Sequence, residues 1–196
     1  MNLTNYYWYF QSAVPARICD EIVKYGKSIS DQMAVTGGMG NKNLNKKQIK
    51  DLKQKRDSNI VWMNDRWIYK EIQPYVHQAN ANAGWNFQWD YSESCQFTKY
   101  EKGQFYDWHC DGWDRPYQRQ EGDPSNGKIR KLSVTVSLSD PKDYKGGELE
   151  FDFRNMDPDK KPNIRKCTEI LPKGSLVVFP GFVWHRVCPV KKGSRY

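Results

Sequence analysis

His109 and Asp111 form a His-x-Asp pair at the end of the aromatic-rich stretch Tyr100–Asp111, and their types and spacing suggest metal binding. If residues 104–111 form a strand, side chains two positions apart point to the same face, about 7 Å from each other. An imidazole nitrogen and a carboxylate oxygen on one face can bind one divalent metal ion. The pair alone decides little, because a chain with 3 His and 23 acidic residues often produces this spacing by chance.

His185 is the second imidazole that we expect at a metal site, because it lies near the start of an apolar strand predicted for residues 184–190. A ligand at the mouth of a β-sandwich would lie at such a position. His77 falls on a predicted helix without an acidic partner at ligand spacing, and we interpret it as structural. Two His and one carboxylate are the facial ligand set that holds non-haem Fe(II) and leaves open coordination positions.

Arg195 follows His185 closely enough for the two to act on one small molecule. If the turn between them places Arg195 opposite Val187, the guanidinium shares a face with His185, about 7 Å along the strand. That offset suits a short dicarboxylate, with one end on the metal and the other held bidentately by the guanidinium. Tyr100 could donate a phenolic hydrogen bond to the same distal carboxylate.

The elements that must position these residues are two N-terminal helices followed by many short strands. One helix begins near Pro15, with an apolar stripe of Ile18, Ile22, Tyr25 and Ile29. The other is capped by Asn64 or Asp65, and Pro74 should kink it or split it. Strands are predicted at Tyr6–Phe10, Ser58–Met63, Phe87–Tyr91, Glu93–Tyr100, Gln104–Asp111, Lys131–Leu138, Glu148–Phe153, Leu176–Phe179 and Trp184–Val190. This order predicts an α+β, mainly β fold, with a β-sandwich or jelly roll supported by N-terminal helices.

Three segments between these elements read as loops. The glycine cluster in residues 36–41 lacks the Lys-Ser/Thr ending of a phosphate-binding loop, and we expect a mobile loop there. The polar segment Gly112–Gly127 is too long for a tight hairpin and could form a lid. Residues 155–166 form a charged connection.

The bulk composition indicates one globular domain without a membrane span or a signal-peptide core. Mean hydropathy is −0.91, yet aromatic residues make up 14% of the chain. Five scattered Cys without a Cys-x-x-Cys pair suggest reduced thiols in the cytoplasm. The net charge of +8 lies largely in Lys42–Arg56, which we interpret as a solvated loop or exposed helix in preference to a nucleic-acid-binding patch.

From about Trp85 to its end, the chain resembles the Fe(II)/2-oxoglutarate dioxygenases, specifically the prolyl 4-hydroxylase-like, PKHD-type branch. The resemblance rests on Tyr100-x-x-Gly103, His109-x-Asp111, Leu132–Leu138, Tyr144–Leu149, Gly174–Pro180, and His185–Val190 with Gly193-x-Arg195. It implies a double-stranded β-helix, with a single domain over residues 1–196, a helical support region at 1–84 and a catalytic core at 85–196. The family continues past the arginine, whereas this sequence ends at Tyr196, so the family's co-substrate contact just past the arginine cannot be assigned.

By the same resemblance, His109, Asp111 and His185 would hold Fe(II), and Arg195, assisted by Tyr100, would bind the far carboxylate of 2-oxoglutarate. The cofactors implied are Fe(II), 2-oxoglutarate and O2, with ascorbate as a possible addition. The implied activity is hydroxylation of a prolyl or other amino-acid residue of a peptide or protein, with release of succinate and CO2. Two alternatives remain open: the same chemistry on a nucleic acid or small molecule, and a non-catalytic jelly-roll binding module.

Aromatic and basic residues close in sequence to the ligands are candidates for the substrate wall. The candidate substrate contacts are Tyr106, Trp113, Tyr117 and Arg130. For Trp108 and Trp184 we favour ordinary core packing. Cys110 and Cys188 flank the ligands, and we interpret both as core thiols.

Overall fold

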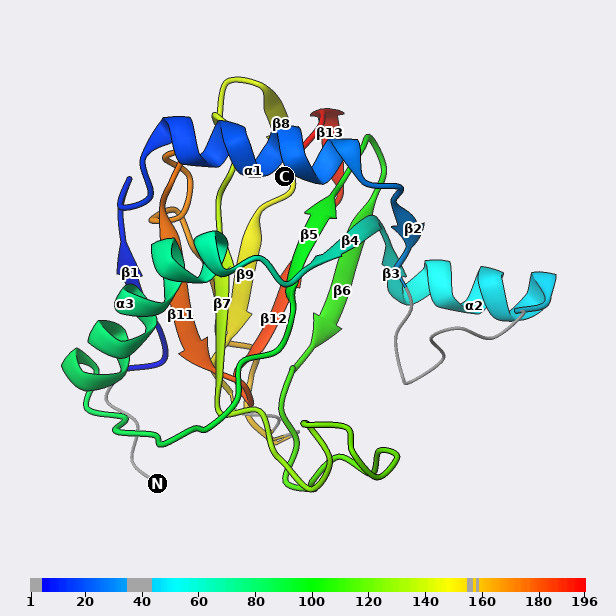
Figure 1. Ribbon diagram of the computed structural model, residues 1–196. Coiled ribbons are helices and arrows are strands. Elements are labelled where there is room, and N and C mark those ends of the chain that lie inside the picture. The colour runs from blue at the N-terminus through cyan, green and yellow to red at the C-terminus, as the bar shows by residue number, and fades with distance from the viewer. Residues whose placement is uncertain (1–4, 35–43, 155–156, 158) are drawn as a thin grey trace.

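Strands dominate the computed structural model, which describes residues 5–34, 44–154, 157 and 159–196 (Figure 1). The helices are α1 (Ala16–Ser28), α2 (Lys46–Lys55) and α3 (Arg66–Asn82). The strands are β1 (Trp8–Phe10), β2 (Gln32–Met33), β3 (Arg56–Asp57), β4 (Asn59–Met63), β5 (Cys95–Lys99), β6 (Phe105–His109), β7 (Leu132–Val136), β8 (Tyr144–Gly146), β9 (Leu149–Asp152), β10 (Ile164–Lys166), β11 (Leu176–Pro180), β12 (Trp184–Val187) and β13 (Val190–Gly193). The predicted glycine-rich loop at residues 36–41 lies outside the described residues.

The strands form a mainly β, jelly-roll architecture, as predicted. The largest sheet has the order β10-β9-β12-β6-β3, and a second has the order β1-β11-β7. Smaller groups are β13-β8 and β2-β4-β5. The region 1–84 therefore contributes strands to these sheets as well as helices, since β1 pairs with β11 and β3 pairs with β6.

β11 is the centre of the core because it is buried on both of its faces. Leu176 and Val178 pack in one cluster with apolar residues of α1 and α3, which lie on the same side of the strands (Figure 1). Val177 and Phe179 pack in a second cluster with Phe151 of β9. A strand covered on both faces must be apolar throughout, which explains the uninterrupted run at residues 176–180.

The two predicted helices are present, but α3 is not split at Pro74 and runs without a break from Arg66 to Asn82. Pro74 is exposed, so water can satisfy the backbone carbonyl that loses its partner to the proline ring. Asp65 occupies the predicted N-cap position, although its side chain makes no capping hydrogen bond. α1 follows Pro15 directly and buries Ile18 and Ile22, as the apolar stripe predicts.

The strand predicted at Phe87–Tyr91 is wrong, because these residues form no ladder. The side chain of Asn80 satisfies both backbone groups of Phe87: its Oδ1 accepts from the Phe87 N–H at 3.0 Å, and its Nδ2 donates to the Phe87 carbonyl at 2.9 Å. A buried amide therefore takes the place of a strand partner. The 155–166 connection also differs from the prediction, since its end forms β10, paired with β9.

The basic stretch largely follows the expectation of an exposed helix. Asn45 caps α2 through a reciprocal pair of hydrogen bonds with Gln48, and the lysines of α2 are exposed. α2 lies at one side of the molecule, away from the helices that cover the strands (Figure 1). Among the described residues, no helix has both the length and the apolar character needed to cross a membrane.

Candidate metal centre

His109 and His185 are far apart in sequence but directly opposite each other in the fold. β6 and β12 are antiparallel, and their register pairs His185 with His109, with ring centroids 4.1 Å apart. β6 ends at His109, so the prediction that the strand continues to Asp111 is wrong. The backbone leaves the ladder there, and the N–H groups of Asp111 and Gly112 both donate to the carbonyl of Gly181, at 2.8 and 2.7 Å.

This turn directs the Asp111 carboxylate toward both imidazoles. Its Oδ1 lies 3.8 Å from Nε2 of His109, and its Oδ2 lies 3.7 Å from Nε2 of His185. One ligand atom from each of the three residues lies within 4.8 Å of the others. In each histidine Nδ1 faces a backbone carbonyl, Asp107 O at 2.7 Å and Val183 O at 3.0 Å. These contacts leave both Nε2 atoms free as ligands, so the donor set fits a facial Fe(II) site.

The electrostatics of the cluster favour the protonation states that bind metal. Burial, followed by the facing His185, lowers the pKa of His109 to about 3, so His109 is neutral. Burial tends to raise the pKa of Asp111, but His185, His109 and the hydroxyl of Ser133 together lower it below its usual value. The Ser133 hydroxyl donates to Asp111 Oδ2 at 2.7 Å. A neutral imidazole and an ionised carboxylate are the forms that coordinate a cation.

Arg195 lies beside Tyr100, and not opposite Val187 as predicted. β13 pairs with β8 instead of folding back on β12, and Arg195 then forms a backbone bridge with Tyr100, with N–H···O distances of 2.9 Å in both directions. Both side chains are buried, and the guanidinium carbon lies 5.7 Å from the centre of the phenol ring. Gly147 makes room for Arg195, because a Cβ at this glycine would lie 2.9 Å from Cδ of the arginine.

Arg195 carries a buried positive charge without an acidic partner in the part of the chain that the structure describes. Burial raises the pKa of the Tyr100 phenol, while the positive charges of Arg56 and Arg195 act in the opposite direction. The phenol therefore keeps its proton and can act as a hydrogen-bond donor. A buried guanidinium beside a neutral phenol is suited to a carboxylate ligand.

Two residues of this region were not predicted from the sequence. Ser133 lies on the face of β7 opposite Leu132, in a row of small polar residues that alternates with the apolar ones, and this alternation was the available signal. Arg56 closes the basic stretch, yet it is only 5% exposed, and its guanidinium carbon lies 4.3 Å from the ring centre of Tyr106. Its place next to the apolar strand β4 was the only hint in the sequence.

The candidate substrate residues lie in different surroundings. Tyr106 stacks on His109, with centroids 3.5 Å apart. Tyr117 donates to the backbone carbonyl of Asp111 at 3.3 Å, and Trp113 is 52% exposed. Arg130 is held by ion pairing with Glu93, and its Nη1 also reaches the Asp111 carbonyl at 3.4 Å.

The other residues singled out from the sequence lie outside the metal cluster. Trp108 lies under the guanidinium of Arg186, at 4.6 Å. Trp184 is half-buried, and its buried indole N–H has no hydrogen-bond partner among the described residues. The described thiols are unpaired; Cys110 is buried and Cys188 is half-buried. His77 is exposed and stacks on Trp89, with centroids 4.7 Å apart.

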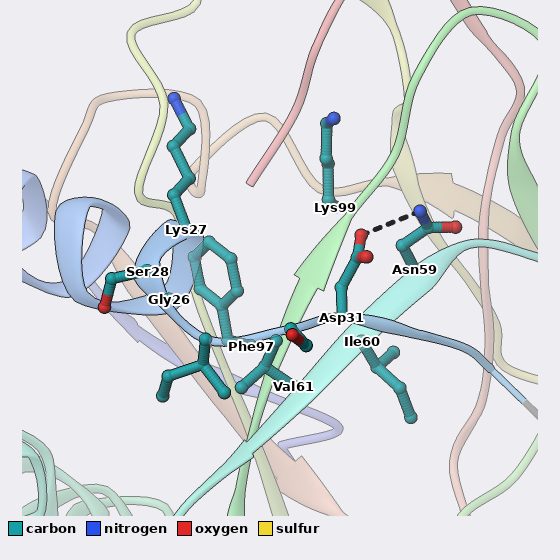
Figure 2. Close-up of a pocket in the computed structure, with 11 residues that line it drawn as sticks. Gly26, Lys27, Ser28, Asp31, Asn59, Ile60, Val61, Phe97 and Lys99 are labelled. Carbon is teal, nitrogen blue, oxygen red and sulfur yellow. Dashed lines mark hydrogen bonds between the residues drawn. The ribbon is translucent and has the colours of Figure 1, made fainter.

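A separate hollow of about 320 Å³ lies where the end of α1 meets β4 and β5 (Figure 2). Lys27, Phe97 and Lys99 are among its lining residues, and Asn59 donates to Asp31 across it at 2.8 Å. The residues of the metal centre do not line this hollow.

Comparison with solved structures supports the fold. The chain superposes on a prolyl hydroxylase from Trichoplax adhaerens, in complex with a peptide fragment of hypoxia inducible factor, with a TM-score of 0.68 and 16% identity, covering 98% of this chain and 81% of the other. A viral collagen prolyl hydroxylase from Paramecium bursaria Chlorella virus-1 gives a TM-score of 0.62 and 20% identity, covering 98% and 92%.

Sequence comparison identifies relatives of the C-terminal half. A PKHD-type hydroxylase from Xanthomonas euvesicatoria pv. vesicatoria is 38% identical over 101 residues, which is 50% of this chain and 39% of that protein. The PKHD-type hydroxylase YbiX of Escherichia coli O1:K1 / APEC is 36% identical over 100 residues, 50% of this chain and 38% of the relative. The match thus spans about two fifths of these relatives. Residues 95–196, which contain the metal-ligand candidates and Arg195, match the 2OG-Fe(II) oxygenase superfamily, and the chain belongs to that family of oxygenases.

Proposed function

We propose that the chain hydroxylates a prolyl, or another amino-acid, residue of a peptide or protein, using Fe(II), 2-oxoglutarate and O2 and releasing succinate and CO2. One observation carries the proposal: three side chains of the facial ligand set converge within 4.8 Å, on the same chain as a buried arginine that lacks an acidic partner among the described residues. We assign Fe(II) to His109, Asp111 and His185, and the far carboxylate of 2-oxoglutarate to Arg195 and Tyr100.

In this assignment residues 85–196 carry the catalytic residues, and 1–84 support them within a single domain. When bound by His109, Asp111 and His185, the iron would supply open coordination positions at which the co-substrate and O2 can meet, so that O2 can serve as the oxidant for C–H hydroxylation. The protein keeps His109 neutral and Asp111 ionised, and it fixes both imidazoles by their Nδ1 contacts. Arg195 and Tyr100 orient the co-substrate from the far end.

A peptide substrate is supported by the nature of the structural neighbours and by the surface around Asp111. Trp113 is exposed, and the side chains of Tyr117 and Arg130 both donate to the backbone carbonyl of the ligand Asp111. Aromatic and basic groups at the rim of a site can hold an apolar ring and a backbone carbonyl. We therefore assign Tyr106, Trp113, Tyr117 and Arg130 to the substrate side.

The test is turnover on proline-containing peptides, measured as succinate release and as the gain of one oxygen atom by mass spectrometry, with Fe(II), 2-oxoglutarate and ascorbate present. His109→Ala and Arg195→Met should reduce both signals to background. His77→Ala removes an exposed imidazole that is not part of the cluster, and should leave them unchanged. Succinate release that persists in His109→Ala would refute the assignment.

The same assay with oligonucleotides in place of peptides tests the alternative that the substrate is a nucleic acid. The exposed lysines of α2 could attract a phosphate backbone, in which case activity would fall steeply with salt. Oxidation of oligonucleotides with such a salt dependence, and without peptide turnover, would replace the peptide proposal.

A further inference from the structure

Arg56 is a buried cation in the N-terminal region without an acidic partner among the residues that the structure describes. It follows the exposed lysines of α2, and β3 pairs it with Tyr106 of β6. Its hydrogen-bond acceptors are neutral: Nε donates to Ser58 Oγ at 2.9 Å, and Nη2 donates to Gln96 Oε1 at 2.6 Å. Because a buried charge is costly unless it is compensated, an anion should approach Arg56 when the protein is in its working state.

Arg56 and Arg195 both lie in the neighbourhood of Tyr100. The guanidinium carbon of Arg56 lies 4.3 Å from the ring centre of Tyr106, which packs against the cluster that contains Tyr100, and the guanidinium carbon of Arg195 lies 5.7 Å from the ring centre of Tyr100. The positive charges of both arginines act to lower the pKa of the Tyr100 phenol, against the larger effect of burial. Guanidinium groups carry donors and no acceptor, so neither arginine can accept the hydroxyl hydrogen of Tyr100. Within the described parts of the chain, that hydrogen has no acceptor. The three residues together present hydrogen-bond donors and two positive charges.

Only a ligand with several acceptor oxygens and negative charge complements such a group, and a carboxylate meets both requirements. We propose that Arg56 is a positioning residue for the dicarboxylate co-substrate: its positive charge repels the hydroxyl hydrogen of Tyr100 and so turns it toward the carboxylate held by Arg195, and the same charge reinforces that of Arg195. This inference rests on the proposed function, because it presupposes 2-oxoglutarate as the ligand. Arg56 thereby contributes to selectivity for oxo acids that carry a second carboxylate.

A purely structural role makes a different prediction. Arg56 covers Tyr106, and Tyr106 stacks on His109, so Arg56 could instead support only the metal ligand. Loss of that support would weaken metal binding and the binding of every oxo acid equally. The two roles can therefore be distinguished by comparing the binding affinities of two oxo acids that differ only at the distal end.

The experiment is calorimetric titration of the Mn(II)-loaded protein with 2-oxoglutarate and with 2-oxopentanoate, in which a methyl group replaces the distal carboxylate. Arg56→Gln should bind 2-oxoglutarate about 10- to 100-fold more weakly, the loss expected for a hydrogen bond to a charged group. Its affinity for 2-oxopentanoate and for Mn(II) should equal that of the unmodified protein. The matched control is Lys55→Gln, which removes an exposed charge at the neighbouring position and should change none of these affinities.

If Arg56→Gln does not fold, the variants Arg56→Lys and Tyr100→Phe provide a second test of the proposed role of Arg56. The lysine variant keeps the charge but not the planar guanidinium, and it should bind 2-oxoglutarate with intermediate affinity. In a Tyr100→Phe background, the further effect of Arg56→Lys should shrink, because the hydroxyl through which Arg56 acts is gone.

Three results would overturn the inference. Unchanged discrimination between the two oxo acids in Arg56→Gln, or in Arg56→Lys if the former does not fold, shows that Arg56 does not act on the distal carboxylate. A parallel loss of both ligands assigns Arg56 to support of the metal site. If the unmodified protein binds neither oxo acid with Mn(II), the proposed function fails and the inference fails with it.

Discussion

Ser133→Ala removes the hydroxyl that holds the Asp111 carboxylate, and it should weaken metal binding without disturbing the fold. The hydroxyl donates to Oδ2 at 2.7 Å, which leaves Oδ1 facing His109. A hydrogen bond to a charged group contributes about 1.5–3 kcal/mol, and each 1.4 kcal/mol corresponds to about tenfold in affinity. The expected loss is therefore about 10- to 100-fold, within the range seen when partners of metal ligands are removed.

The assay is anaerobic titration of Fe(II), repeated with Mn(II), on the unmodified protein and the variant. Thr135→Val is the matched control: it deletes a hydroxyl two residues along the same strand, on the same face, and this hydroxyl makes no hydrogen bond to any residue that the structure describes. Urea unfolding of the metal-free proteins checks that both variants retain their stability.

The effect should also depend on pH. The hydrogen bond from Ser133 lowers the pKa of Asp111, so its removal raises that pKa and lets protons compete better with the metal. The deficit of Ser133→Ala should therefore widen as the pH falls and narrow as it rises. Equal metal affinities for Ser133→Ala and the unmodified protein, or an equal loss in Thr135→Val, would refute the idea that this hydroxyl orients the carboxylate.

Three further predictions concern stability, each read by urea unfolding. Gly174→Ala should lower the free energy of unfolding by more than about 2 kcal/mol, because Gly174 has φ +80° and an added Cβ would clash with the Val14 carbonyl. Its control is Gly122→Ala: Gly122 has φ +88° but open space around it, so this variant should lose only the backbone strain of about 1–2 kcal/mol. Phe151→Ala should cost about 3–5 kcal/mol, because its ring is fully buried. Burial raises the pKa of Tyr106 to about 12, whereas the pKa of a tyrosine in the unfolded chain is about 10. The neutral phenol therefore contributes fully to stability below about pH 10, and this contribution is lost as the pH rises toward about 12. In Tyr106→Phe the loss of stability at alkaline pH should be smaller.

The residues that the structure brings together at the metal centre could be named from the sequence because the matched family segments supplied what the His-x-Asp spacing alone could not decide. His185 was also the only remaining histidine at the start of a predicted strand. The central strand β11 could also be predicted, since residues of a strand that is buried on both faces must be apolar in succession. This prediction does not require knowing which strands pair with β11.

What could not be predicted depends on partners distant in sequence. The place of Arg195 required knowing that β13 pairs with β8, and nothing in the turn after β12 encodes that choice. The segment that begins at Phe87 has the alternating pattern of a strand, but the backbone N–H and carbonyl of Phe87 hydrogen-bond to the side chain of Asn80 instead of to another strand. Arg56 belongs to a run of lysines whose composition predicts exposure, and only the pairing of β3 with β6 buries it.

The site is divided into two chemically opposite halves. Around the metal centre, Asp111 and the two Nε2 atoms offer acceptors to a cation, whereas Arg195, Tyr100 and Arg56 offer donors and positive charge to an anion. In the proposed function, a 2-oxo dicarboxylate would be complementary to both halves, with its oxo-acid end on the metal and its distal carboxylate on the arginines. Since Ser133 acts on the first half and Arg56 on the second, their substitutions should add within about 0.5 kcal/mol in 2-oxoglutarate binding at saturating metal. A large coupling between them would mean that the stack of Tyr106 on His109 transmits the effect of Arg56 to the metal, and that the two halves are not independent.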